Sequence, residues 1–172
     1  MRIELQEIEI QNFKGIQSLV LNMANGLCVR GDNGTGKTTV FDAVCWVLFD
    51  KDSKGTANSQ IKPVDKAGAE VHNLESIVDA VFVVDGKPVR LRKSFQEKWT
   101  KKRGSAAKTH EGHTTTYSVD EVPVSLREYK AAVAAIVEES AFKLLTNPYE
   151  FASLHWKDRR SVLMQLCGDV SV

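Results

Sequence analysis

Apolar and polar residues alternate in several stretches near the start of the chain, and this period of two is typical of β-strands. Residues 2–10 follow it with one slip, and residues 16–21 follow it again after a turn-forming segment at 12–15. Residues 26–30, Gly-Leu-Cys-Val-Arg, are predicted to form a short buried strand. The N-terminal part of the chain is therefore expected to contribute several strands to a sheet.

A second group of strands is expected further along the chain as an antiparallel meander. Residues 76–84 and 89–99 flank an Asp-Gly dipeptide at 85–86, which is a strong signal for a tight hairpin turn. Residues 100–114 are polar and predict a mobile loop, and residues 115–119 predict the third strand of the meander.

Three segments have the apolar spacing of helices. They are residues 38–49, residues 155–166, and residues 126–138, where Ser125 is the expected N-cap and Glu128 occupies the capping-box position. Irregular segments are expected at 50–68 and 142–151. Together these elements predict an α/β fold with a mixed β-sheet and an attached antiparallel meander.

The strongest chemical signal lies between residues 31 and 38. The octet Gly-Asp-Asn-Gly-Thr-Gly-Lys-Thr matches the phosphate-loop pattern G-x-x-x-x-G-K-[ST]. Its glycines let successive backbone N–H groups point into one hollow, at the positive N-terminal end of the following helix. Lys37 supplies a charge for the β- and γ-phosphates, and the Thr38 hydroxyl is a ligand for Mg²⁺. An ordinary glycine-rich turn is the alternative, and the expected strand and helix around the octet argue against it.

Composition and charge narrow the classes of function. The 172 residues carry a net charge of +1, so an argument for nucleic acid or membrane binding has to be local. The longest apolar run, residues 44–49, is too short to cross a bilayer, and no secretory signal pattern is present. Cys28, Cys45 and Cys167 lie far apart in apolar stretches, which predicts buried free thiols and a cytoplasmic protein.

Several segments of the chain resemble a known family. Residues 11–15, Gln-Asn-Phe-Lys-Gly, precede a phosphate loop that continues as Gly-Lys-Thr-Thr at 36–39 and is followed by Phe-Asp-Ala-Val at 41–44 and Leu-Phe at 48–49. With residues 147–163, these segments resemble the N-terminal half of the ATPase head of SMC-like proteins, and of SbcC-type DNA repair ATPases in particular, including phage and prophage relatives. The resemblance implies that residues 1–172 are the N-terminal lobe of an ABC-type head, truncated before a coiled coil.

The resemblance also implies a set of ligand-binding residues for ATP and Mg²⁺. Lys14 stands where the family has a cation that reaches the nucleotide phosphates. Asn147 stands near a glutamine that senses Mg²⁺ and the attacking water, although it serves equally well as the turn residue before Pro148. Thr38 is the other implied metal ligand. The residues expected to wrap the phosphates are Asn33, Gly34, Thr35, Gly36, Lys37, Thr38 and Thr39.

The family's other catalytic parts are not evident in the sequence. ABC-type heads use an Asp-Glu pair after a buried strand, a signature loop and a switch histidine, which the family carries in the C-terminal half of the head. Residues 81–85 mimic the acidic strand, but we interpret them as part of the hairpin. The resemblance therefore implies that the chain alone is inactive, and that its partners are that C-terminal half, a second head, a nuclease subunit and DNA. An ATPase of the RecF or OLD-nuclease type and a small P-loop kinase remain alternatives.

A basic stretch gives the only local argument for DNA. Between residues 87 and 108 nine lysines and arginines accompany a single acid, Glu97. Such a cluster binds phosphate backbones without regard to sequence. It also serves to keep an exposed edge strand from aggregating, and the sequence favours neither interpretation.

Overall fold

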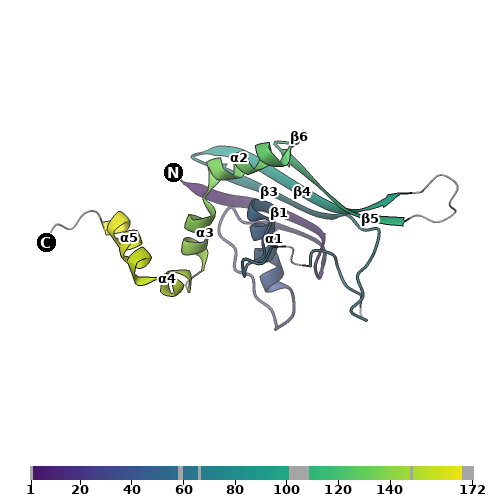
Figure 1. Cartoon of the computed structure of the whole chain (residues 1–172), viewed down its shortest axis with the longest axis horizontal. Coiled ribbons are helices and arrows are strands. Elements are labelled where there is room, and N and C mark those ends of the chain that lie inside the picture. Colours follow the sequence, from purple (N-terminus) through teal and green to yellow (C-terminus); the bar gives the residue numbers. More distant parts are fainter. Residues whose placement is uncertain (1, 58–59, 66, 101–108, 148, 168–172) are drawn as a thin grey trace. The chain divides into compact units, whose positions relative to one another are not determined.

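The computed structural model describes residues 2–57, 60–65, 67–100, 109–147 and 149–167. The chain divides into two compact units, Met1–Ile136 and Val137–Val172, and each is described by itself. The first unit contains β1 (Ile3–Phe13), β2 (Ile16–Asn22), α1 (Lys37–Phe49), β3 (Ser76–Val84), β4 (Lys87–Thr100), β5 (Thr109–Val119), β6 (Val122–Val124) and α2 (Leu126–Ile136) (Figure 1).

One six-stranded sheet forms the body of the first unit, with the strand order β2-β1-β3-β4-β5-β6. All of its pairings are antiparallel. The expected α/β class is confirmed, but the mixed sheet is wrong for the described strands. Tight turns join β1 to β2 and β3 to β4, and such turns make sequential strands antiparallel. The segment containing α1 then returns the chain to the free side of β1, where β3 pairs antiparallel.

The expected strand positions are close to those observed, except in the first part of β5 and at residues 26–30. The prediction of a loop over residues 100–114 is wrong for its last part, because β5 already begins at Thr109, and residues 101–108 lie outside the described ones. Thr109 and Thr114 in this part of the strand pair with Thr100 and Gln96 of β4. Their β-branched side chains favour extended structure even though their hydroxyls are polar, which is why polarity alone misassigned them.

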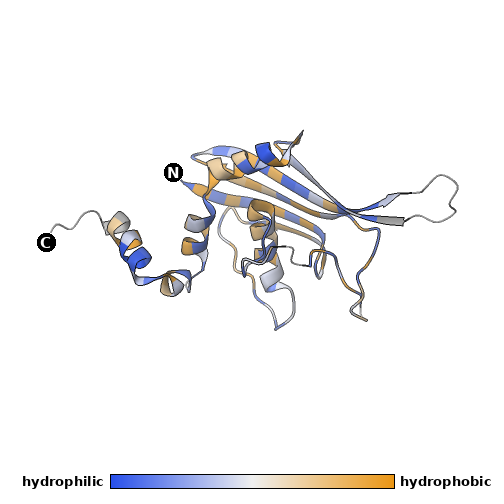
Figure 2. Cartoon of the chain, viewed as in Figure 1, coloured by the Kyte–Doolittle hydropathy of each residue, from blue (hydrophilic) through white to orange (hydrophobic). Residues whose placement is uncertain are grey.

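The hydrophobic core lies between α1 and one face of the sheet. Alternate strand residues on this face are fully buried, and they are Ile8, Ile10, Val78, Ala80 and Leu91. Phe13 meets Trp46 of α1, with ring centroids 5.4 Å apart. Figure 2 shows the resulting pattern, with α1 mainly hydrophobic and the strands alternating. Because α1 is buried on most sides, from Val40 to Leu48, it is less amphipathic than its sequence suggested.

The expected strand at residues 26–30 does not form. Leu27 and Val29 are 45% and 43% exposed, and the segment has no strand assignment. A strand needs a neighbour to satisfy its backbone groups, and no described strand pairs with this segment. Cys28 is consequently exposed, which corrects the prediction of a buried thiol, whereas Cys45 in α1 is buried as expected.

Helix α2 starts with the predicted capping box. The Ser125 hydroxyl accepts the Glu128 backbone N–H at 3.3 Å, and a Glu128 carboxylate oxygen accepts the Ser125 N–H at 2.8 Å. Tyr129 then buries its ring and donates its hydroxyl to the Val47 carbonyl at 2.8 Å. This bond fastens α2 to α1, so both helices cover the same face of the sheet.

The second unit consists of short helices. They are α3 (Glu139–Thr146), α4 (Glu150–Ser153) and α5 (Trp156–Cys167). The final helix was predicted within about a residue at each end, but the loop expected at 142–151 is wrong for most of its length. Asn147 and Pro148 suggested a broken segment, whereas the break is confined to a short turn between α3 and α4.

Candidate nucleotide-binding site

The phosphate loop begins α1 and has the conformation that its glycines permit. Gly36 is the N-cap of α1 with φ of 94°, a left-handed conformation that strains a residue with a side chain. A Cβ on Gly31 would lie 2.7 Å from Thr35 Oγ1, so this position also excludes side chains. The Thr35 hydroxyl donates to the Asp32 carbonyl at 2.8 Å and closes the loop. No side chain caps α1, so its first N–H groups remain directed at the loop.

Lys37 is folded back over its own loop. Its Nζ donates to the Gly31 carbonyl at 2.5 Å and to the Asp32 carbonyl at 2.6 Å. These carbonyl dipoles partly compensate a positive charge that stands at the positive end of a helix dipole. An anion at this position would be a stronger partner than either carbonyl.

The loop encloses a pocket of about 340 Å³. Its lining contains all the residues expected to wrap the phosphates, namely Asn33, Gly34, Thr35, Gly36, Lys37, Thr38 and Thr39. It also contains Gly15, which was not predicted as a site residue. Gly15 belongs to the β1–β2 turn. The turn was predicted, but its position beside the phosphate loop depends on the pairing of the sheet.

Lys14 precedes Gly15 but is engaged elsewhere. Its Nζ donates to Asp42 Oδ2 of α1 at 2.7 Å, with the two side chains 22% and 11% exposed. Burial alone would raise the pKa of Asp42, but its hydrogen bonds with Lys14 and Ser53 and the Lys14 charge together hold that pKa below its ordinary value. Asp42 belongs to the Phe-Asp-Ala-Val segment of the family resemblance, but no local pattern in the sequence indicates its pair with Lys14.

Asn147 adopts the turn role that was its alternative. It is the C-cap of α3, and its Oδ1 accepts the Tyr149 N–H at 3.0 Å. Its carbonyl also accepts the Glu150 N–H at 3.1 Å. The Asn147 side chain therefore stabilises the turn after α3 within the second unit. Its role as a metal ligand remains a prediction.

Both acidic segments that follow strands form tight turns. Asp85 has φ of 48° between β3 and β4, and its carboxylate accepts the Arg2 N–H at 2.7 Å. The hairpin interpretation of residues 81–85 is therefore confirmed. Asp120 and Glu121 likewise have positive φ between β5 and β6, and Asp120 accepts the Arg90 N–H at 2.8 Å. Neither turn lies among the residues that line the phosphate-loop pocket.

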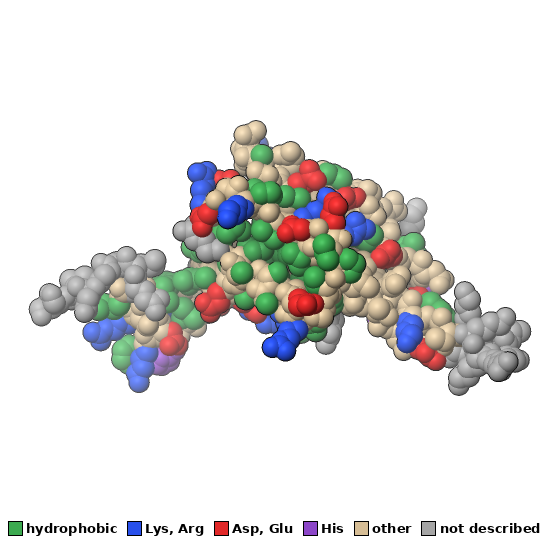
Figure 3. All heavy atoms as spheres, turned by 90° about the horizontal axis from the view of Figure 1, so that it is seen from above, with side chains coloured by type: hydrophobic (Ala, Val, Ile, Leu, Met, Phe, Trp, Pro, Cys, Tyr) green, Lys and Arg blue, Asp and Glu red, His purple; other side chains and the backbone are tan. Residues whose placement is uncertain are grey.

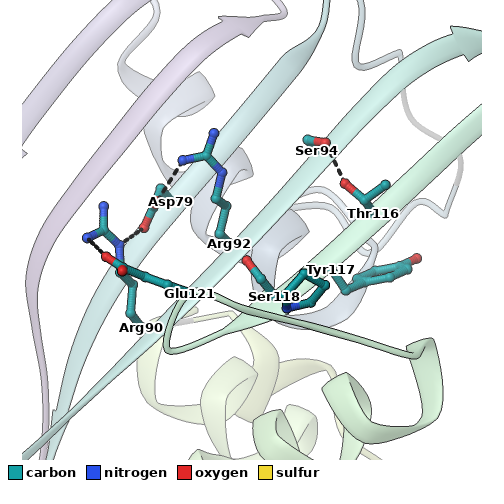
Figure 4. A pocket seen from close by; sticks show the side chains of 9 residues that line it. Asp79, Arg90, Arg92, Ser94, Thr116, Tyr117, Ser118 and Glu121 are labelled. Carbon is teal, nitrogen blue, oxygen red and sulfur yellow. Dashed lines mark hydrogen bonds and ion pairs between the residues drawn. The ribbon is translucent and has the colours of Figure 1, made fainter.

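The basic stretch is neutralised in part by acids from other strands. Arg90 and Arg92 point toward Asp79 on the open face of the sheet, in a pocket of about 550 Å³ (Figure 4). Arg90 Nε lies 2.8 Å from Asp79 Oδ1, Arg92 lies 3.5 Å from Oδ2, and Arg90 also reaches Glu121 at 3.2 Å. These ion pairs leave less free positive charge than the sequence count suggested.

A third cation of the stretch, Lys93, is buried beneath α1. Its Nζ donates to the Trp46 carbonyl at 2.9 Å, pairs with Asp50 and lies over the Trp46 ring. Burial lowers the pKa of Lys93 to about 8, although the Asp50 charge opposes this. Since β4 lies between β3 and β5, the alternative of a charged edge strand is wrong, while DNA contact remains a prediction.

Other cations of the stretch are placed differently. Lys87 and Lys98 are exposed, while the three consecutive cations at 101–103 and Lys108 lie outside the described residues. On the face shown in Figure 3, basic and acidic side chains of the described residues are interspersed among hydrophobic ones. The described surface on this face therefore presents no continuous basic field.

The fold and the phosphate loop together define a P-loop NTPase. Comparison with known proteins identifies the family within this class. A family model described as an AAA domain, AAA_23, matches residues 7–143, and the chain therefore belongs to this family. It is an SMC-like member, with the fold of the N-terminal portion of an ABC-type ATPase head.

Chromosome partition proteins and a solved head domain are among the similar proteins. The chain is 32% identical over 95 residues to the chromosome partition protein Smc of Desulfitobacterium hafniense (strain Y51), covering 54% of this chain and 8% of that protein. It is 23% identical over 131 residues to the Smc of Halobacteriovorax marinus, covering 73% and 10%. The Smc head domain from Pyrococcus yayanosii, with a coiled coil and joint, has a TM-score of 0.56 at 15% identity, covering 88% of this chain and 29% of that one.

The chain thus spans only about a tenth or less of the curated relatives it matches. Among the described residues, no helix has the length and apolar character needed to cross a membrane.

Proposed function

We propose that the chain binds ATP with Mg²⁺ at the phosphate loop, as the nucleotide-binding lobe of an SbcC-type DNA repair ATPase. The observation that carries this proposal is the loop itself. An uncapped helix N-terminus, a left-handed Gly36 and the Lys37 ammonium converge on one pocket. Backbone N–H groups and a cation at a helix N-terminus are what a triphosphate requires.

In this proposal each residue of the phosphate loop has a role that follows from its chemistry. The backbone N–H groups between Asn33 and Thr39 would bind phosphate oxygens, and Lys37 would exchange its two carbonyl partners for the β- and γ-phosphates. The Thr38 hydroxyl would bind Mg²⁺. When bound, that ion neutralises charge that develops on the phosphates during transfer.

Hydrolysis in this proposal needs parts beyond the loop. The acidic turns at 85 and 120–121 belong to hairpins, so we assign neither of them as the group that activates water. A C-terminal lobe and a second head would complete the site, with Asn147 as a further candidate Mg²⁺ ligand. A nuclease partner and a cytoplasmic location belong to the same proposal. An ATPase of the RecF or OLD-nuclease type is the alternative. It would share the phosphate loop with an SbcC-type ATPase but would lack the long coiled coil.

DNA contact is a separate part of the proposal. Fewer cations are available for it than the nine lysines and arginines between residues 87 and 108. Arg90, Arg92 and Lys93 are engaged with acids. The contact would therefore involve the exposed Lys98 and the cations at 101–103 and 108, and would be made to phosphates without regard to sequence.

The nucleotide site is tested by Lys37→Ala. Removing the one loop cation should weaken ATP binding by at least about a hundredfold, because charged hydrogen bonds to phosphate contribute roughly 1.5–3 kcal/mol each and Lys37 makes more than one. Isothermal calorimetry with ATP and Mg²⁺ measures this.

The matched control is Lys54→Ala, an exposed lysine that does not line the pocket. It should bind ATP as the parent does. If Lys37→Ala keeps the affinity of the parent, the site assignment is wrong.

A further inference from the structure

The β1–β2 turn adjoins the phosphate loop in a strained conformation. Gly15 lines the pocket, and a Cβ on Gly36 would lie 3.9 Å from Ile16 Cγ1, so the turn and the loop are near neighbours. Asn12 and Lys14 have φ of 48° and 50°, in the left-handed region, which Asn tolerates but which strains a residue such as Lys. Such positions persist only when surrounding contacts impose them, and they concentrate at functional sites.

Three hydrogen bonds help to impose this conformation. The Lys14 N–H donates to the Ile61 carbonyl at 2.7 Å, and Asn12 Nδ2 donates to the Glu75 carbonyl at 3.0 Å. The Ser76 hydroxyl donates to the Asn12 carbonyl at 2.6 Å. These bonds hold the backbone of the turn from the side of β3 and the loop before it.

The fourth contact ties the turn to α1. Asp42 accepts Lys14 Nζ at 2.7 Å on one carboxylate oxygen and the Ser53 N–H at 2.9 Å on the other. Asp42 lies three residues after Thr39, so the two share one face of α1, and Thr39 lines the pocket. The pair therefore joins the two walls of the pocket, the helix that carries the phosphate loop and the turn that carries Gly15.

We infer that Asp42 is a positioning residue for the nucleotide, and that its ion pair with Lys14 acts as a strut holding the Gly15 turn against the phosphate loop. This inference rests on the proposed function. It differs from the role that the family resemblance implies for Lys14, a direct contact with phosphate. To make that contact Lys14 would have to leave a carboxylate that is almost nine-tenths buried, and an unpaired buried carboxylate is costly.

The two roles predict opposite effects of removing the Asp42 charge. If the pair is a strut, Asp42→Asn loosens the turn and weakens ATP binding. If Lys14 is a phosphate ligand restrained by Asp42, the same change frees the ammonium and leaves binding equal or tighter.

A double-mutant cycle provides the experiment. ATP binding with Mg²⁺ is measured by calorimetry for the parent, Lys14→Met, Asp42→Asn and the double variant. We expect each single variant to bind about tenfold more weakly, and the double variant to be no weaker than the singles, since both remove one interaction. Lys14→Arg keeps the charge and should bind within about threefold of the parent.

Thermal unfolding of each variant identifies the temperature at which all are folded, and binding is compared there. Asp79→Asn is the matched control, because it removes a buried ion-pair partner outside the phosphate-loop pocket. It should lower stability without changing affinity.

The outcomes separate the two proposals. Equal or tighter binding by Asp42→Asn, with weaker binding by Lys14→Met, overturns the strut and supports a phosphate ligand. Parental binding by both single variants overturns the strut alone, provided that Lys37→Ala loses binding. A parent chain that does not bind ATP overturns the proposed function and the strut with it.

Discussion

Helices α1 and α2 cover the same face of the sheet but begin in opposite ways. The first N–H groups of α2 are met by the Ser125 hydroxyl, and Glu128 adds an acid to its first turn. Helix α1 has a glycine N-cap, no side-chain cap and no acid in its first turn. An uncapped N-terminus costs stability unless something outside the helix binds it. Helix α2 is therefore completed within the chain, whereas the N-terminus of α1 is left open for the anion of the proposed function.

The two ends of α1 differ as well. Lys37 at the N-terminus is half-exposed, and its Nζ donates to the Gly31 and Asp32 carbonyls of the loop. At the other end, Lys93 is 1% exposed and donates to the Trp46 carbonyl of the last turn. A cation at a helix C-terminus is favoured by the dipole. One end of α1 is therefore closed by the sheet, and the other is open.

The largest expected effect concerns the closed end. The pKa of Lys93 is lowered from 10.5 to about 8 in the folded chain, so between these values the unfolded chain binds more protons and stability rises with pH. Between pH 7 and 9.5 the parent should gain about 2 kcal/mol relative to Lys93→Met, since each full pH unit of difference contributes about 1.4 kcal/mol. Urea unfolding at the two pH values measures this.

Burial raises the pKa of Tyr117 and Tyr129, which lowers stability above pH 10 in both proteins, and the comparison of variants removes this contribution. Lys93→Met keeps the apolar stem, and because the Asp50 side chain is 44% exposed, its carboxylate stays solvated when the lysine is removed. A parallel pH dependence in the two proteins would show that Lys93 does not titrate as described.

A smaller effect is expected from moving the acid of α2 to the same position of α1. Thr39 is the third residue after the N-cap of α1, as Glu128 is in α2. Thr39→Glu should weaken ATP binding about tenfold or more, because a carboxylate in the pocket repels phosphate and competes for the free N–H groups. Thr39→Gln, with the same shape and no charge, should bind more tightly than Thr39→Glu. Equal affinities would mean that the open N-terminus does not bind the anion.

The smallest effect is expected at the closed N-terminus of α2. Ser125→Ala removes the cap and should lower the free energy of unfolding by about 1 kcal/mol. Affinity for ATP should not change, since Ser125 does not line the phosphate-loop pocket. Chemical denaturation and calorimetry on the same preparation test both statements, and a loss of affinity would contradict the separation between the two helix ends.

Features that depend on neighbouring residues were predictable from the sequence. The Asp-Gly turn at 85–86, the Ser125 capping box and the octet before α1 all have local causes, because a few side chains select the backbone conformation. Predictions failed where polarity was taken for irregular structure, as in the first part of β5, or where an apolar segment was assumed to have a partner, as at residues 26–30.

The sequence by itself determined the class of the protein, because the phosphate loop consists of consecutive residues whose types select its conformation. Only the tertiary structure decided which charges surround that loop. Lys14 and Asp42 are separated by 28 residues, and Lys93 and Asp50 by 43. Strand register and helix packing bring such residues together, and neither is encoded in a local pattern. The same register buried Lys93 and paired Arg90 with Asp79. Several cations that the sequence shows as a basic stretch are therefore engaged in ion pairs in the fold.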